Sequence, residues 1–472
     1  MQRDTLCVAV RPGVLQVSIH FPDRFAFKRL ILLSLPNEFR CKRTPAAAAR
    51  FLHFSRMSVY PNAARESTCL IFIAPQSRSL AIYMFMPKAI HTEGRPVWAE
   101  ISLKAIQGNL KVVRRQIGPK PKILAVVKSN AYGLGSVPIS KALEKAGADW
   151  FGVTCTNEGI ELRDSGIRKR ILVLTGFWPG EEKRVLKHGL TPVVTRLDDV
   201  RLLERAAKAI RNKKARIPFH LKINTGMNRL GIEAEEVDAF AAALADCRHI
   251  ALEGTFTHFA SAEDFSARQT DDQEQVFLRC LARMRELGVS PGIIHMANSG
   301  AICARPTTFA DMVRPGAVLY GYYQSFDPPH KGEEVRERLP LEPSLSLRAR
   351  IITLRDVPAG QGIGYSARFT TERPSRIAVI NAGYADGILR QRTNRGCVLV
   401  RGRRVPLVGT ISMDLTTLDV TDVPAVQLGD IVTIYGKDGA DSIVVSDVAR
   451  EIGTVTSDLL CALGRRVPRY YV

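Results

Sequence analysis

The sequence of 472 residues contains no long apolar run. A membrane-spanning helix needs about 20 consecutive apolar residues, and the nearest candidate, residues 70–86, is interrupted by Pro75 and the polar residues that follow it. The N-terminus also lacks the order of a secretory signal, which is a basic start, one apolar core and a small-residue cleavage site. We therefore expect no membrane partner and a cytoplasmic location.

Cysteine pairs and basic stripes are missing as well. The nine cysteines are scattered and form no C-x-x-C spacing, which argues against a disulfide framework or a metal site and fits a reducing cytoplasm. The formal net charge is +21, but no dense basic stripe is interleaved with aromatic residues. A solvated positive surface explains this charge, so we expect no nucleic-acid partner.

Residues 1–94 differ in character from the rest of the chain. They contain thirteen Lys or Arg against five Asp or Glu, an alanine tract and no sustained apolar period. We expect this basic N-terminal extension to be poorly ordered, or to precede a true translation start at Met57, Met84 or Met86. A targeting peptide is the alternative.

From Trp98 onward, short apolar runs alternate with amphipathic stretches. Apolar residues at three- and four-residue spacing predict helices at 102–116, 200–211, 234–244 and 271–287. Strands are expected at 123–128, 150–154, 171–174, 192–195, 218–223, 252–259, 293–298 and 312–320.

Eight strand–helix units in about 225 residues are typical of an α/β fold of the (β/α)8 TIM-barrel type, with a doubly wound open sheet as the alternative. The barrel is favoured because polar residues fall near the carboxyl ends of the predicted strands, where barrels carry their chemistry. These residues are Lys128, Lys222, His258, His295, Asn298 and Arg314.

Proline and charged residues concentrate between residues 325 and 343, which indicates a linker. Beyond it, short strands separated by Gly, Pro and Asp are expected at 345–354, 377–381, 397–400, 405–411 and 430–435. We therefore expect a barrel domain over residues 95–340 and a smaller, mostly β C-terminal domain over 341–472.

The first barrel strand ends on Lys128, and a Ser-Asn-Ala-Tyr-Gly turn follows it. An ammonium group at the exit of a buried strand must reach water, meet an anion or lose its proton. Lys128 is therefore either a snorkelling lysine or one prepared to form a Schiff base. The residues Asn130 to Gly133 resemble the pyridoxal-phosphate lysine motif of alanine racemases, although Leu134 stands where the family usually has His. The resemblance covers residues 95–472 and implies pyridoxal 5′-phosphate as the cofactor.

Two segments, 298–301 and 314–317, can cradle the cofactor's phosphate. Small residues that open a helix present free backbone N–H groups to an anion, and barrels often bind phosphate after strands seven and eight. By resemblance, the hydroxyl of Tyr132 reaches the same phosphate. The other cofactor-binding residues expected here are Asn298, Ser299, Gly316 and Ala317.

Arg314 resembles the family arginine that faces the pyridine nitrogen. An arginine keeps its proton at any accessible pH, so Arg314 is expected to donate to the ring nitrogen and to disfavour protonation there, which favours racemisation over transamination. His258 and His295 are expected to orient Arg314 and a tyrosine. The resemblance also implies that Arg229 contacts the cofactor's phenolic oxygen and the substrate carboxylate. Lys222, which is carbamylated in some members, is expected to steady Arg229.

The C-terminal domain is expected to supply the remaining groups. By resemblance, Tyr365 is the second catalytic base, and Met413 contacts the substrate. Tyr384 and Asp414 lie in blocks that resemble the family's segments for substrate entry and carboxylate binding. Ser457 stands where the family usually has a tyrosine, so we expect a pocket that admits side chains larger than methyl.

The resemblance implies reversible interconversion of L- and D-alanine, which supplies D-alanine for peptidoglycan. Lys128 would take the α-proton of the D-isomer and Tyr365 that of the L-isomer. In the family this tyrosine reaches the partner's barrel, which implies a homodimer with shared active sites. Alternatives are a broad-specificity or serine-preferring racemase, a basic-amino-acid decarboxylase that fits the C-terminal blocks poorly, and a non-catalytic pyridoxal-phosphate carrier, which would lack the C-terminal domain.

Overall fold

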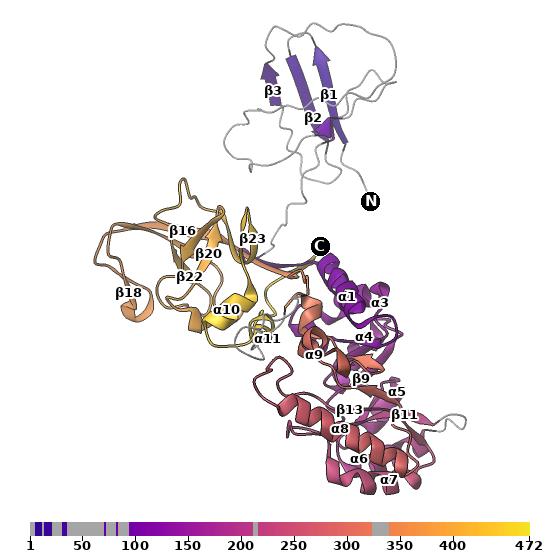
Figure 1. The fold of residues 1–472 in the computed structure, drawn as a ribbon. Coiled ribbons are helices and arrows are strands. Elements are labelled where there is room, and N and C mark those ends of the chain that lie inside the picture. Colours follow the sequence, from indigo (N-terminus) through magenta and orange to yellow (C-terminus); the bar gives the residue numbers. More distant parts are fainter. Residues whose placement is uncertain are drawn as a thin grey trace. The chain divides into compact units, whose positions relative to one another are not determined.

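The computed structural model describes residues 94–210, 216–322 and 339–472, together with five short strands before residue 84. Contacts divide the chain into two compact units, Met1–His91 and Thr92–Val472. In the first unit, β1 (Thr5–Arg11), β2 (Val14–His20) and β3 (Ile31–Ser34) form an antiparallel sheet, and β4 (Leu70–Ile71) pairs with β5 (Ile82–Tyr83) (Figure 1). The expectation for residues 1–94 stays a prediction.

The second unit contains a closed barrel of eight parallel strands. In chain order they are β7 (Lys122–Val126), β8 (Trp150–Val153), β9 (Arg170–Val173), β10 (Val193–Val194), β11 (Ile217–Asn224), β13 (Ile250–Phe256), β14 (Ile293–His295) and β15 (Met312–Val313). They pair in the orders β15-β7-β8-β9 and β10-β11-β13-β14. A parallel bridge from Leu172 to Thr191 and a 2.9 Å hydrogen bond from the Arg314 N–H to the Ala297 carbonyl close the ring. The predicted barrel is confirmed, and the open sheet is excluded.

Helices between the strands cover the outside of the barrel (Figure 1). They are α1 (Leu103–Ile117), α3 (Ser136–Ala146), α4 (Thr156–Asp164), α5 (Glu182–Lys187), α6 (Leu197–Ala209), α7 (Val237–Ala245), α8 (Gln269–Glu286) and α9 (Ser299–Ala304). Four of them lie within a few residues of the predicted helices. Ser102, for example, caps α1 by accepting a 3.1 Å hydrogen bond from the Ala105 N–H.

The alternation of side chains along each strand separates the inside of the barrel from the layer beneath the helices. Leu124 and Val126 point inward, where they form a cluster with Trp150, Phe256 and other barrel residues. Their neighbours on β7 belong to the larger core that packs against the helices. Polar side chains that also point into the barrel are therefore surrounded by apolar side chains.

The last barrel strand is shorter than the predicted range of 312–320. β15 ends at Val313, and Ala317–Tyr320 forms a 3-10 helix, η3, in place of a strand. Pro315 has no N–H group with which to continue the ladder, and the backbone turns at Gly316 (φ −121°, ψ −94°). This turn places Arg314 at the barrel mouth.

The C-terminal half is a mostly β domain, as predicted. Its main sheet has the order β21-β20-β23-β16-β19-β22, with β24 paired to β23. The strands of this sheet are β16 (Leu345–Val357), β19 (Ser375–Ile380), β20 (Cys397–Val400), β21 (Arg403–Pro406), β22 (Thr416–Asp419), β23 (Ile431–Asp438) and β24 (Asp441–Ile443). A separate hairpin is formed by β17 (Gly362–Ile363) and β18 (Phe369–Thr370). The domain also contains the helices α10 (Val445–Glu451) and α11 (Thr456–Cys461). β21 stops at Pro406, so the strand predicted at 405–411 is mostly loop.

Two strands from the ends of this unit complete the sheet. β6 (Val97–Ile101) pairs antiparallel with β16, and β25 (Arg469–Tyr471) pairs in parallel with β6. The start of the range predicted for the barrel domain therefore contributes a strand to the C-terminal sheet. None of the helices in the described residues is both long enough and apolar enough to cross a membrane.

Candidate active site

A pocket of about 440 Å³ lies at the carboxyl end of the barrel strands. It collects most of the side chains predicted from the sequence, which are Lys128, Tyr132, Lys222, Arg229, His258, Asn298, Ser299, Arg314, Gly316 and Ala317. Ser457, at the second position of α11, lines the pocket from the C-terminal domain. The residues whose roles were inferred separately from the barrel strands thus share one cavity.

Lys128 projects from a strained turn. The four residues that follow it, Ser129 to Tyr132, have φ values between 52° and 56° and form a left-handed turn within α2 (Lys128–Tyr132). Each such residue costs about 1–2 kcal/mol when it carries a side chain. Burial and the charge of Arg229 lower the pKa of Lys128, while Glu158 and Cys461 raise it. The structure therefore favours a lysine that loses its proton more easily than an exposed one.

The predicted phosphate cradle is formed by parts of three segments. The Gly316 N–H donates to the Ser299 hydroxyl at 2.9 Å, and a Cβ added to Gly316 would lie 2.5 Å from the Tyr132 hydroxyl. Asn298 caps α9 by accepting from the Ala301 N–H at 3.0 Å. The Tyr132 hydroxyl, Ser299 and the start of α9 therefore meet around Gly316, where a larger side chain would collide with the tyrosine hydroxyl.

The guanidinium of Arg314 is completely buried at one wall of the pocket. Its Nη1 donates to Nδ1 of His295 (3.1 Å) and to the His295 carbonyl (2.8 Å). Its Nη2 donates to the carbonyls of Thr257 and Met296 and to Nδ1 of His258 (3.2 Å). Within the described part of the chain these contacts engage both Nη groups, so the Nε–H is the donor left for a ligand. Burial lowers the pKa of Arg314 to about 9, which still leaves it protonated at neutral pH.

A chain of buried groups continues from Arg314 away from the pocket. Nε2 of His295 lies 2.9 Å from Nδ1 of His220, and Nε2 of His220 lies 3.6 Å from a carboxylate oxygen of Glu253. Glu253 in turn forms an ion pair with Arg170. Because a guanidinium only donates, His295 must accept at Nδ1 and carry its proton on Nε2; His220 then accepts at Nδ1 and directs its own proton toward Glu253. One set of tautomers therefore satisfies the hydrogen bonds from Arg314 to His220, and Nε2 of His220 faces Glu253 across 3.6 Å.

The charges around the pocket keep the histidines neutral. Burial, followed by the charge of Arg314, places the pKa of His258 and of His295 well below the usual value, and burial also lowers the pKa of His220. Burial and the charges of Arg314, Arg229 and Lys128 lower the pKa of Lys222 to about 8. A bound anion would offset this concentration of positive charge.

Three predicted residues of the C-terminal domain lie on other loops of the same chain. Tyr365 begins η4 (Tyr365–Ala367) and is 70% exposed; Met413 is 51% exposed and Tyr384, in η5 (Tyr384–Asp386), is 37% exposed. None of the three is among the described residues that line the barrel pocket. Their loops adjoin one another, because the Thr410 hydroxyl donates to the Tyr365 carbonyl and the Tyr384 N–H donates to Ser412.

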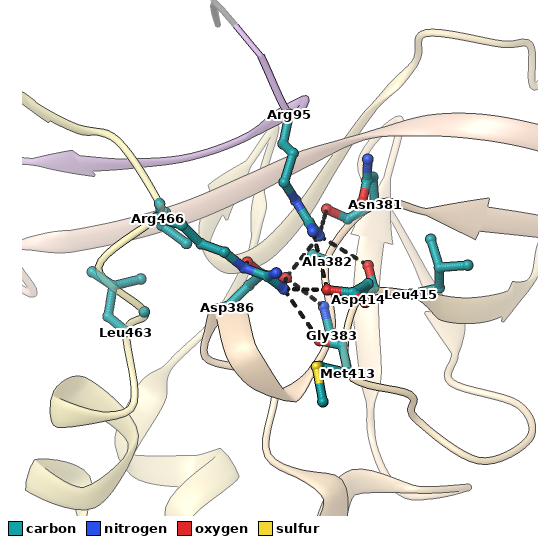
Figure 2. A network of polar contacts seen from close by, with 12 residues as sticks. Arg95, Asn381, Ala382, Gly383, Asp386, Met413, Asp414, Leu415, Leu463 and Arg466 are labelled. Atoms are coloured by element: carbon teal, nitrogen blue, oxygen red, sulfur yellow. Dashed lines mark hydrogen bonds and ion pairs between the residues drawn. The ribbon is translucent and has the colours of Figure 1, made fainter.

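Asp414 holds these loops in place through a network of ion pairs (Figure 2). Its carboxylate contacts Arg95 at 3.1 Å and Arg466 at 2.6 Å. Both arginines also pair with the fully buried Asp386, whose carboxylate accepts from the Gly383 N–H at 3.0 Å. Asp414 therefore supports the backbone on either side of Tyr384 and Met413.

Several groups around this site were missed by the sequence analysis, namely Glu158, His220, Glu253, Arg170, Arg95, Asp386 and Arg466. A usable signal existed for His220, because it lies two positions before Lys222 on one strand and so shares its inward direction. The other six residues come close to the site only in the folded structure, so local sequence gave no sign of them.

Comparisons with known proteins agree with this arrangement. The family model for the alanine racemase N-terminal domain matches residues 101–324, and that for the C-terminal domain matches 344–471. Alanine racemases of Methanococcus maripaludis and Geobacter sulfurreducens are 39% and 41% identical to the chain, covering 80% of it and 99% and 98% of the relatives.

Solved structures give the same result. An alanine racemase from Clostridium difficile 630 has a TM-score of 0.73 at 33% identity, covering 81% of this chain and 97% of that one. The enzyme from Bartonella henselae, solved with covalently bound pyridoxal phosphate, has a TM-score of 0.71 at 30% identity, covering 80% of this chain and 100% of that one.

The neutral histidines predict a sensitivity to acid. His220, His258 and His295 have folded pKa values below that of an unfolded histidine, ~6.5, so the unfolded chain binds more protons as pH falls through that value. The contribution of these histidines to the free energy of unfolding is complete above pH ~6.5. Below that pH it is lost, by up to about 1.4 kcal/mol per pH unit for each histidine. Urea unfolding of the full chain between pH 7 and pH 5 measures this slope. His220→Asn should make it shallower, and an unchanged slope would contradict the assignment.

Proposed function

The chain belongs to the alanine racemase family, and from that premise we propose that it interconverts L- and D-alanine with pyridoxal 5′-phosphate joined to Lys128. The observation that carries the proposal is the placement of Lys128, a phosphate cradle and the buried Arg314 around one barrel-mouth pocket. The C-terminal domain distinguishes the chain from non-catalytic carriers, which lack it. The D-alanine product would supply peptidoglycan synthesis.

The residues of the pocket fit the parts of this cofactor. Lys128 provides the amine for its aldehyde, and the Tyr132 hydroxyl, Ser299 and the backbone at Gly316 hold its phosphate. The Nε–H of Arg314 would be the donor available to the ring nitrogen. Pyridoxal phosphate, when bound, withdraws electrons from the amino acid's Cα and so makes the α-proton acidic.

Two bases on opposite faces of the substrate explain racemisation. Lys128 would remove the α-proton of the D-isomer from one face, and Tyr365 would remove that of the L-isomer from the other. A tyrosine has a reference pKa near ~10, so a phenolic base needs support at neutral pH. His258 supplies it, because Arg314 occupies Nδ1 and leaves the Nε2–H as a donor toward a phenolic oxygen.

A second copy of the chain is needed to bring these bases together. Tyr365, Tyr384 and Met413 lie exposed on adjoining loops, away from the pocket of their own barrel. We infer a homodimer in which these loops of one subunit cover the barrel mouth of the other. Arg229 and Met413 would then bind the substrate from the two subunits. The unpaired cysteines of the described residues fit a cytoplasmic location.

Replacement of Lys128 tests whether the cofactor is attached to this residue. Reduction of the loaded protein with borohydride should fix the cofactor to the peptide that contains Lys128, and mass spectrometry should find it there. Lys128→Ala should abolish the modified peptide while retaining the fold by circular dichroism. A cofactor fixed elsewhere in either protein would sink the assignment.

The role of Tyr365 predicts an asymmetry between the two enantiomers. In Tyr365→Phe, exchange of solvent deuterium into L-alanine should slow by about 10² or more, as expected for loss of a general base, while exchange into D-alanine falls much less. Cofactor absorbance should persist, which controls for folding. Equal slowing in both enantiomers would contradict the assignment.

Shared sites predict complementation between inactive chains. Lys128→Ala and Tyr365→Phe subunits, unfolded together and refolded as a mixture, should regain activity, because one of the two sites in a mixed dimer contains both native bases. At equal amounts, about half of the dimers are mixed and each has one intact site, so activity should approach about a quarter of the native value. Recovery no greater than the sum of the separate variants would show that each chain supplies both bases to itself.

A further inference from the structure

The strained turn after Lys128 is held by groups outside it. The Ser129 N–H points out of the turn and donates to Oε1 of Glu158 at 2.5 Å. Two residues beyond the turn, the Tyr471 hydroxyl donates to the Leu134 carbonyl at 3.0 Å. A left-handed run of residues with side chains persists only where the surroundings hold it, so these contacts determine where the Lys128 side chain starts.

Glu158 joins two neighbouring loops at the pocket. It lies in the first turn of α4, and its second oxygen, Oε2, accepts from the N–H of Thr154 at 2.9 Å and from the Thr154 hydroxyl at 3.2 Å. Thr154 follows β8 and lines the pocket, while Ser129 follows β7, the strand paired with β8. One carboxylate thus ties the ends of adjacent barrel strands together.

The same carboxylate has an electrostatic effect on the lysine. Burial is the largest influence on Lys128 and Arg229 the next, and both lower its pKa; Glu158 raises it. Loss of the Glu158 charge should therefore leave a larger fraction of Lys128 unprotonated at neutral pH.

We propose that Glu158 is a positioning residue for Lys128, which holds the left-handed turn through the Ser129 amide and keeps a negative charge beside the lysine. The proposal rests on the proposed function for the importance of Lys128, but its contacts are within the chain. It assigns a role in the site to a residue that does not line the pocket.

The test uses the full chain freed of cofactor with hydroxylamine and three variants. Glu158→Ala removes the acceptor and the charge, Glu158→Gln keeps an acceptor and removes the charge, and Tyr471→Phe loosens the turn without changing charge. Glu161→Gln is the matched control, since Glu161 lies on the same helix and accepts from the Ser136 hydroxyl, outside the turn. Hydrogen exchange at the Ser129 amide and the pH dependence of Lys128 acylation are measured in each.

Glu158→Ala should speed exchange at the Ser129 amide about tenfold or more, as expected when a hydrogen bond to a charged group is lost. Glu158→Gln should keep slow exchange but acylate Lys128 severalfold faster at neutral pH. Tyr471→Phe should not shift the pH dependence of Lys128 acylation. The proposal would be overturned if the Ser129 amide of Glu158→Ala exchanged at the native rate. It would also be overturned if Glu161→Gln changed amide exchange or Lys128 acylation as much as the Glu158 variants do. Failure of Lys128 to carry the cofactor would not alter these results, so the two failures are distinguishable.

Discussion

The buried charge of Arg314 is the constraint on which the rest of the site depends. A guanidinium buried against the barrel wall must place its N–H groups on acceptors, and here five acceptors from β14 and from the segments after β13 and β14 surround it. Two of these are ring nitrogens that accept only in neutral histidine. The barrel therefore fixes the tautomers of His258 and His295, and Glu253 lies at the far end of the chain of rings, 3.6 Å from Nε2 of His220.

The same charge explains why the pocket favours a dianion. Lys128, Lys222, Arg229 and Arg314 line one cavity, and each positive group makes it harder for the lysines to remain charged. A phosphate and a substrate carboxylate would restore the balance, whereas a neutral ligand would not. The lining of the cavity thus favours an anionic ligand.

The alternation of apolar runs and amphipathic stretches was enough to predict the barrel, because its strands are buried on both faces and its helices on one. Five of the six polar residues expected at strand ends line one pocket, and His295 lies behind Arg314. The relay from His220 to Arg170 was not predicted, because its members come from three separate strands and are joined only inside the closed barrel. Nor does local sequence show that Asp414 pairs with Arg95, which precedes it by 319 residues.

The C-terminal domain acts on the lysine of its own chain as well as presenting Tyr365 outward. Arg469, which is half-buried, donates to the Gly133 carbonyl at 2.9 Å and to carbonyls after α11. Helix α11 itself approaches so closely that a Cβ on Gly133 would lie 2.5 Å from the Leu460 carbonyl. The strand that carries Arg469 is in turn paired with β6, at the start of this unit. The turn that carries Lys128 is thus held by the last residues of the chain as well as by the barrel, so the β domain helps to place the lysine of its own chain. In the proposed dimer the same domain would also present Tyr365 to the other subunit.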